Sequence, residues 1–178
     1  YDAIGDMYAY IKSSVGSKKF ENHDIVKLGF WPGGDRDGNP FVTADITRDV
    51  MNELRLTLMK CYYNDLKELQ KKLTFKALQG SITQLRNNLY TAMFNPKKTV
   101  GYDDIIGPLL DIREGLIAKY HSLYLKDLDQ LIDKVKIFKT HFATLDIRQD
   151  HSQHYLTVES ILKKTGVISE NLDELSQD

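Results

Sequence analysis

A run of apolar residues at helical spacing begins just after Thr43 and constrains the fold more than any other feature. The residues that recur every three or four positions are Ile46, Val50, Leu54, Leu58, Tyr62, Leu66, Leu69 and Leu73. This pattern predicts a helix of about 30 residues, or roughly 45 Å. Thr43 is a suitable N-cap, and Asp45 suits a first turn, where the helix dipole favours acidic side chains. A helix of this length indicates a large helical protein.

Shorter patterns of the same kind predict further helices and two strands. The helices span residues 2 to about 15, 76–94, 101–119 and 123–138, and a last helix runs to about 164 with Asp150 or Ser152 as its N-cap. Gly107-Pro108 either kinks its helix or marks an early first turn. Residues 16–24 read as a polar connection, and the acidic tail from Gly166 as a loop or frayed end. Two apolar runs, 25–30 and 142–147, have strand length, so the fold class is mainly α with long helices and two short strands.

Composition limits the class of protein. A chain of 178 residues with 42% hydrophobic and 28% charged residues is typical of one globular domain or two small ones. The net charge of −1 gives no reason to expect nucleic acid or a membrane as a partner. The lone Cys61 excludes an intramolecular disulfide and favours a reducing, cytoplasmic location. Because the chain begins at Tyr1, inside a predicted helix, we expect it to be an internal fragment of a longer chain, with no complete domain boundary visible.

The stretch from Leu28 to Thr43 cannot lie inside a helix or strand, because it holds several glycines and two prolines. It predicts a rigid loop between a strand and the long helix, carrying Trp31 and the triplet Asp35-Arg36-Asp37. Loops of this kind often carry function, and Gly33-Gly34 can bring backbone amides close to an anion. The duller interpretation is a tight turn in which Asp35 and Asp37 hydrogen-bond backbone amides.

Two metal interpretations are weaker. Asp35, Asp37 and Asn39 alternate like calcium ligands, but the calcium-loop template then requires glycine and glutamate where Pro40 and Ile46 stand. His151 and His154 share a face if their segment is helical, yet no third zinc ligand is evident nearby. We therefore predict no metal ligand in this chain.

Two separate motifs resemble one family. The sequence from Trp31 through Gly33-Gly34-Asp35-Arg36-Asp37-Gly38-Asn39-Pro40 resembles the glycine-rich signature of phosphoenolpyruvate carboxylases. Far downstream, Leu145-Asp146-Ile147-Arg148-Gln149-Asp150, followed by Ser152 and His154, resembles the second landmark of that family. Two motifs in the right order are more specific than either alone, although the match between them is patchy.

The resemblance implies a substrate site. The family carboxylates phosphoenolpyruvate with bicarbonate to give oxaloacetate and phosphate, an anaplerotic step, with Mg²⁺ or Mn²⁺ as cofactor. Arg148 is implied to bind the anionic groups of the substrate with its planar fork, and Trp31 to wall the pocket. Arg36, between two aspartates, is expected to support the site as an ion-paired arginine. The remaining implied substrate-binding residues are Gly33, Gly34, Asp35, Asp37, Asn39 and Gln149.

The family fold is an α/β barrel with many added helices, in which the chemistry occurs at the carboxyl ends of the strands. The family's Thr-Ala-His-Pro-Thr motif, its His-Gly-Arg-Gly-Gly-type loop and the metal-binding carboxylates are absent from this sequence. We therefore expect the fragment to be inactive and to bind no metal, and the full-length enzyme to be a homotetramer. The competing hypothesis is a non-enzymatic helical interaction module whose glycine loop binds an anion. It leaves the co-occurrence of the two motifs unexplained.

Overall fold

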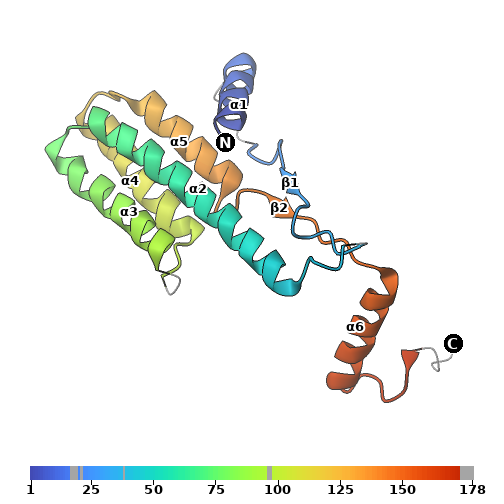
Figure 1. The fold of residues 1–178 in the computed structure, drawn as a ribbon. Helices are drawn as coiled ribbons and strands as arrows, with labels where there is room; N and C mark the ends of the chain where they lie inside the picture. Colours follow the sequence, from blue (N-terminus) through green and yellow to red (C-terminus); the bar gives the residue numbers. More distant parts are fainter. Residues whose placement is uncertain (17–19, 21, 38, 96–97, 173–178) are drawn as a thin grey trace. The chain divides into compact units, whose positions relative to one another are not determined.

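The computed structural model describes residues 1–16, 20, 22–37, 39–95 and 98–172. Within these ranges the chain forms six helices and two strands (Figure 1). The elements are α1 (Asp2–Val15), β1 (Gly29–Phe30), α2 (Ala44–Lys72), α3 (Lys76–Phe94), α4 (Tyr102–Lys119), α5 (Leu125–Phe138), β2 (Thr144–Leu145) and α6 (His151–Lys164). The predicted mainly α fold class is confirmed. Residues 17–19 and 21 of the predicted connection, and 173–178 of the predicted tail, lie outside the described residues.

The helix bounds follow the sequence pattern closely, whereas the strands are much shorter than predicted. Thr43 caps α2, because its hydroxyl lies 3.4 Å from the backbone N–H of Ile46. Pro108 lies well inside α4, so the alternative in which it marks a first turn is wrong. Among the described helices, none combines the length and the apolar character that crossing a membrane requires.

The chain divides into two compact units. The first holds Tyr1–Gly29 and Met51–Thr144, and the second holds Phe30–Val50 and Leu145–Asp178. The division falls within β1, α2 and β2, so each of these elements contributes to both units. The two strands pair in a two-stranded parallel sheet. That this sheet is part of a barrel stays a prediction.

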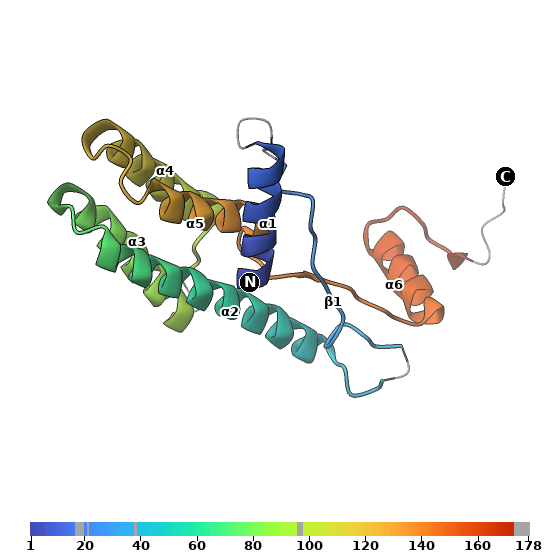
Figure 2. The same cartoon turned by 90° about the horizontal axis from the view of Figure 1, so that it is seen from above.

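The first unit is built around four helices. The part of α2 from Met51 onward, α3, α4 and α5 lie side by side, and short connections make consecutive helices run in opposite directions (Figures 1 and 2). Helix α4 packs against both α3 and α5. This is the arrangement of an up-and-down helical bundle, in which each helix turns one apolar stripe inward.

The apolar stripes of these helices form one core. Its largest fully buried side chains include Leu58 and Tyr62 from α2, Leu89 from α3, and Leu109 and Ile112 from α4. Burying one such aliphatic side chain contributes about 1.5–3 kcal/mol relative to leaving it exposed. The 3.6-residue period of the sequence therefore determines both the helices and the core.

Helix α1 packs on α5 through charged contacts as well as apolar ones. Lys134 donates to the carboxylates of Asp2 at 2.8 Å and Asp65 at 3.1 Å. Burial alone would lower the pKa of Lys134, but these hydrogen bonds outweigh it, and the pKa lies above its usual value. A second ion pair joins the same two helices, because Lys12 of α1 donates to the buried carboxylate of Asp133 in α5 at 2.6 Å.

The backbone of Lys139, directly after α5, has φ 53° and ψ −110°. A side chain with a Cβ rarely adopts a positive φ, so this position is strained. The Lys139 amide donates to the Val135 carbonyl at 2.8 Å, and its carbonyl accepts from the buried Tyr62 hydroxyl at 3.0 Å. These hydrogen bonds hold the residue in its unfavourable conformation.

Replacing Lys139 with glycine removes this strain. We expect Lys139→Gly to raise the free energy of unfolding by about 1 kcal/mol, because glycine adopts positive φ without a Cβ clash. Urea denaturation of the 178-residue chain measures the change. Lys139→Ala is the matched control: it also removes the amine but keeps the Cβ, so it should give no gain. An equal gain from both variants would show that the amine, not the backbone, destabilises the position.

Candidate functional site

The two sequence motifs meet through backbone hydrogen bonds in the second unit. The Asp146 amide donates to the Phe30 carbonyl at 2.8 Å, and the Arg148 amide donates to the Gly34 carbonyl at 2.9 Å. The Arg36 amide then donates to the Arg148 carbonyl at 2.8 Å, and Asp35 and Arg148 form a parallel bridge. The parallel pairing of β1 and β2 therefore continues into both motifs and brings Arg148 to the glycine loop, as the sequence predicts.

A tight turn interrupts this ladder. Between Phe30 and Gly34 the first strand advances four residues while its partner advances two, from Asp146 to Arg148. The extra residues form the turn Trp31-Pro32-Gly33-Gly34, closed by a hydrogen bond of 2.9 Å from the Gly34 amide to the Trp31 carbonyl. The turn has proline at its second position and glycine at its third, and Gly33 has φ 80°. These features are typical of a type II turn. The turn also explains why β1 is short.

Neither glycine of the turn can carry a side chain. A Cβ on Gly34 would lie 2.1 Å from the Asp146 carbonyl oxygen, and one on Gly33 would lie 2.5 Å from Val50 in α2. The glycines therefore allow the loop to approach both the β2 strand and the first turns of α2. The Gly34 amide is used inside the turn, so it does not face a ligand as the sequence interpretation proposes.

The guanidinium of Arg148 lies between the two aspartates of the loop. Its Nε is 3.9 Å from Asp35 Oδ1, and one terminal nitrogen is 3.9 Å from Asp37 Oδ2. These distances are too long for hydrogen bonds, and 62% of the side chain is exposed. Among the described residues its guanidinium donates no hydrogen bond. The two carboxylates thus orient the guanidinium while its donors stay accessible to a carboxylate or phosphate.

Arg36 supports the loop, but not through the ion pairs that the sequence predicts. Its Nη2 donates to the Thr47 hydroxyl at 2.8 Å, and that hydroxyl lies 2.7 Å from the Gly33 carbonyl. Thr47, in the first turn of α2, is only 5% exposed. It was missed by sequence reasoning, although Thr43 and Thr47 at i, i+4 place its hydroxyl over the start of the helix. The aspartates that flank Arg36 face Arg148 instead.

The other predicted residues surround this arrangement. Trp31 is 60% exposed, so its ring does not fill the core. Asn39 Oδ1 accepts from the Phe41 amide at 3.1 Å and so forms an Asx-turn. Within the described ranges Asn39, and not Asp35 or Asp37, makes the side-chain hydrogen bond to a backbone amide that the tight-turn interpretation expects. The Gln149 side chain accepts from the Asp150 amide at 3.1 Å. A role in binding substrate stays a prediction for all three.

Helix α6 begins just after the second motif. Asp150 caps it by accepting from the Ser152 amide at 2.9 Å, and the Ser152 side-chain and backbone hydrogen bonds hold the pKa of Asp150 below its usual value. His151 is almost fully exposed, with its ring nitrogen 3.7 Å from Asp150. In the described part of the chain, no group of three or more acidic, histidine or cysteine side chains is placed to hold a metal ion.

Comparison with known proteins explains why these motifs occur together. A profile of the phosphoenolpyruvate carboxylase family matches residues 2–100 and 81–178. The chain belongs to the phosphoenolpyruvate carboxylase family. It is 30% identical over 170 residues to the phosphoenolpyruvate carboxylase of Aeromonas hydrophila, covering 80% of this chain and 19% of that protein. The enzyme of Vibrio parahaemolyticus is 27% identical over 93% of this chain and 22% of its own length. The chain spans about a fifth of the length of these relatives.

The close approach at Gly34 leads to a testable prediction. We expect Gly34→Ala to lower the free energy of unfolding by about 3 kcal/mol, because the new methyl group collides with a backbone carbonyl that cannot move away. Urea denaturation followed by circular dichroism measures the loss. The matched control is Gly80→Ala on α3, where a Cβ meets nothing within 4 Å; it should stabilise by about 0.5–1 kcal/mol. Similar effects of the two variants would contradict the geometry.

The Thr47 hydroxyl leads to another prediction. We expect Thr47→Val to cost about 1–3 kcal/mol, because it leaves Arg36 and the Gly33 carbonyl without their partner. Hydrogen exchange of the Arg36 and Arg148 amides should accelerate, since these amides close the ladder of the loop. Thr47→Ser, which keeps the hydroxyl, should retain slow exchange. Fast exchange in the serine variant as well would show that the methyl group, not the hydroxyl, holds the loop.

Proposed function

We propose that the full-length protein carboxylates phosphoenolpyruvate with bicarbonate, giving oxaloacetate and phosphate, and that this chain supplies part of its substrate-binding surface. The observation that carries the proposal is the backbone pairing of Arg148 with the loop from Gly34 to Arg36, in a chain that a single family profile matches almost from end to end. The competing interaction module has no reason to bring these two motifs together.

Arg148 binds the anionic group of the substrate in this proposal. Its exposed guanidinium offers several donors in one plane, which suits a carboxylate or a phosphate. Asp35 and Asp37 hold its orientation from one side. Two anionic substrates repel each other, so fixing the position of one of them supplies part of the barrier reduction. Trp31, exposed at the turn, provides an apolar wall that keeps water from an enolate.

The charges of the loop show why these residues do not suffice. Asp35 and Asp37 balance Arg36 and Arg148, so the loop carries no net positive charge. Two anions need further cationic groups, which we assign to other parts of the full-length chain. The metal that the family implies also does not fit here, because the described residues hold no suitable ligand cluster and the two aspartates are turned toward Arg148. The cysteine content favours a reducing compartment such as the cytoplasm.

The test of this proposal concerns Arg148 in the full-length protein. We expect Arg148→Gln to lower kcat/KM for phosphoenolpyruvate by roughly a hundredfold or more, since a lost charge-assisted pair of hydrogen bonds is worth about 3 kcal/mol. A coupled assay of bicarbonate-dependent oxaloacetate formation measures the rate. The control is Arg48→Gln, an exposed arginine on α2 whose described ion pair is with Asp45; it should leave the rate unchanged.

Three outcomes would contradict different parts of the proposal. An inactive wild-type full-length protein would exclude the carboxylase activity. An active wild type with an equally active Arg148→Gln variant would remove Arg148 from the site. Turnover by the 178-residue chain alone would show that the residues present here form a complete site after all.

A further inference from the structure

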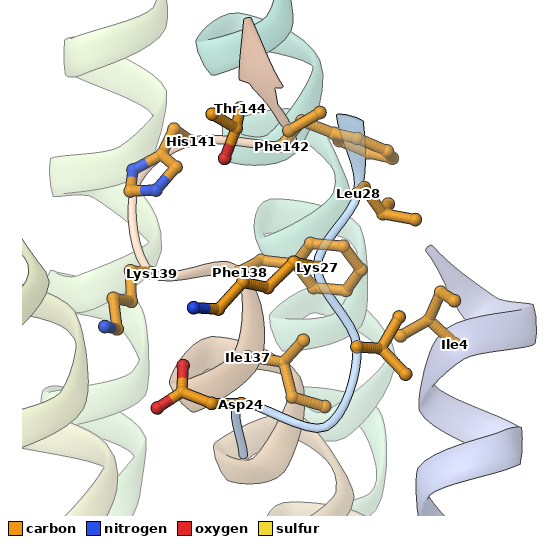
Figure 3. A pocket seen from close by; sticks show the side chains of 12 residues that line it. Ile4, Asp24, Lys27, Leu28, Ile137, Phe138, Lys139, His141, Phe142 and Thr144 are labelled. Atoms are coloured by element: carbon orange, nitrogen blue, oxygen red, sulfur yellow. The ribbon is translucent and has the colours of Figure 1, made fainter. Parts of the chain in front are cut away.

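A cavity of about 250 Å³ lies in the first unit, and none of the residues of the two motifs from Trp31 to Pro40 and from Leu145 to Asp150 lines it. Helix α1, the segment leading to β1, the end of α5 and the connection to β2 all contribute to its wall (Figure 3). Every residue in that wall belongs to one compact unit. The cavity is therefore a feature of a single packed body, and the proposed carboxylase function does not use it.

One side of the cavity is apolar. Ile4, Leu28, Phe138 and Phe142 line it, and Phe138 is almost fully buried in the core. The rings of Phe138 and Phe142 pack against each other with their centres 5.4 Å apart. These side chains are fixed by the core, so they offer a preformed surface for an apolar group of a few carbon atoms.

The other side carries an excess of positive charge. The side chains of Lys27 and Lys139 extend toward the same side of the cavity in Figure 3, with His141 above them and the Asp24 carboxylate below. Neither lysine amine has an ion-pair partner within the described ranges. Two ammonium groups and one carboxylate leave one net positive charge, to which a protonated His141 would add. A cationic rim over an apolar floor is suited to an anion with an apolar body.

The backbone at this rim is an independent sign of function. Lys139 occupies a positive φ that glycine or asparagine would adopt at lower cost. Strained positions of this kind concentrate at ligand sites, where the side chain is needed despite the cost of its backbone. Here the strained residue carries one of the two amines for which the described part of the chain offers no ion-pair partner.

We propose that this cavity binds a small organic anion, a carboxylate or phosphate group on a compact apolar body. The anionic group lies between the amines of Lys27 and Lys139, and the apolar part contacts Leu28 and Phe138. The volume is slightly below the roughly 300–1,000 Å³ of drug-sized ligand sites, so the ligand is small.

Titration of the 178-residue chain, followed by NMR of its backbone amides, tests the proposal. The probes are butyrate, its neutral analogue butyramide, and inorganic phosphate. We expect butyrate to shift the amides of residues 137–144 in a saturable way, with at least tenfold weaker binding of butyramide and of phosphate. Absence of saturable shifts, or equal binding of butyramide, would overturn the proposal. Equal binding of phosphate would overturn it too, because the apolar floor would then contribute nothing.

Variants at the rim test the assignment of the amines. Lys27→Gln and Lys139→Gln should each weaken butyrate binding about fivefold, since each removes one exposed charge and leaves a polar side chain only one atom shorter. The control is Lys126→Gln, an exposed lysine on α5 that does not line the cavity; it should bind butyrate like the wild type. Thermal unfolding of each variant checks that it is folded. Folded rim variants with wild-type affinity would place the anion elsewhere and refute the proposal.

Discussion

The contact between the backbone of Gly34 and the carbonyl of Asp146 determines the geometry of the second unit. At this point two segments separated by more than a hundred residues approach so closely that a single methyl group would collide. The approach lets the Arg148 amide reach the Gly34 carbonyl and the Arg36 amide reach the Arg148 carbonyl. Because these bonds are made by the backbone, they fix where the arginine side chain starts, whatever its guanidinium binds.

The charges around this contact explain how Arg148 can be positioned while its hydrogen-bond donors stay available to a ligand. Asp35 and Asp37 both lie near the guanidinium of Arg148, but at 3.9 Å they attract it without taking its hydrogen bonds. Arg36, by contrast, is tied to the Thr47 hydroxyl and holds the loop to α2. One arginine of the site is thus structural and the other accessible. The division of roles depends on which partner each side chain reaches.

Much of the fold could be predicted because it depends on local patterns. The apolar period predicts all six helices of the described residues, and the Asp150 cap was among the expected ones. The strands were overestimated, because apolar runs do not reveal where a turn such as Trp31–Gly34 interrupts the pairing. The predicted ion pairs of Arg36 were wrong for a similar reason. Neighbours in sequence point to opposite sides of an extended chain, so the flanking aspartates face Arg148 instead.

The sequence by itself determined the helices, the tight turn and the two motifs, since each follows from side-chain periodicity or from the conformational freedom of glycine and proline. Only the tertiary structure decided that Thr47 anchors Arg36, that Arg148 lies between two aspartates, and that Lys27 and Lys139 share a cavity wall. These pairings join residues far apart in the chain. Their distances depend on how whole elements pack, which no local pattern encodes.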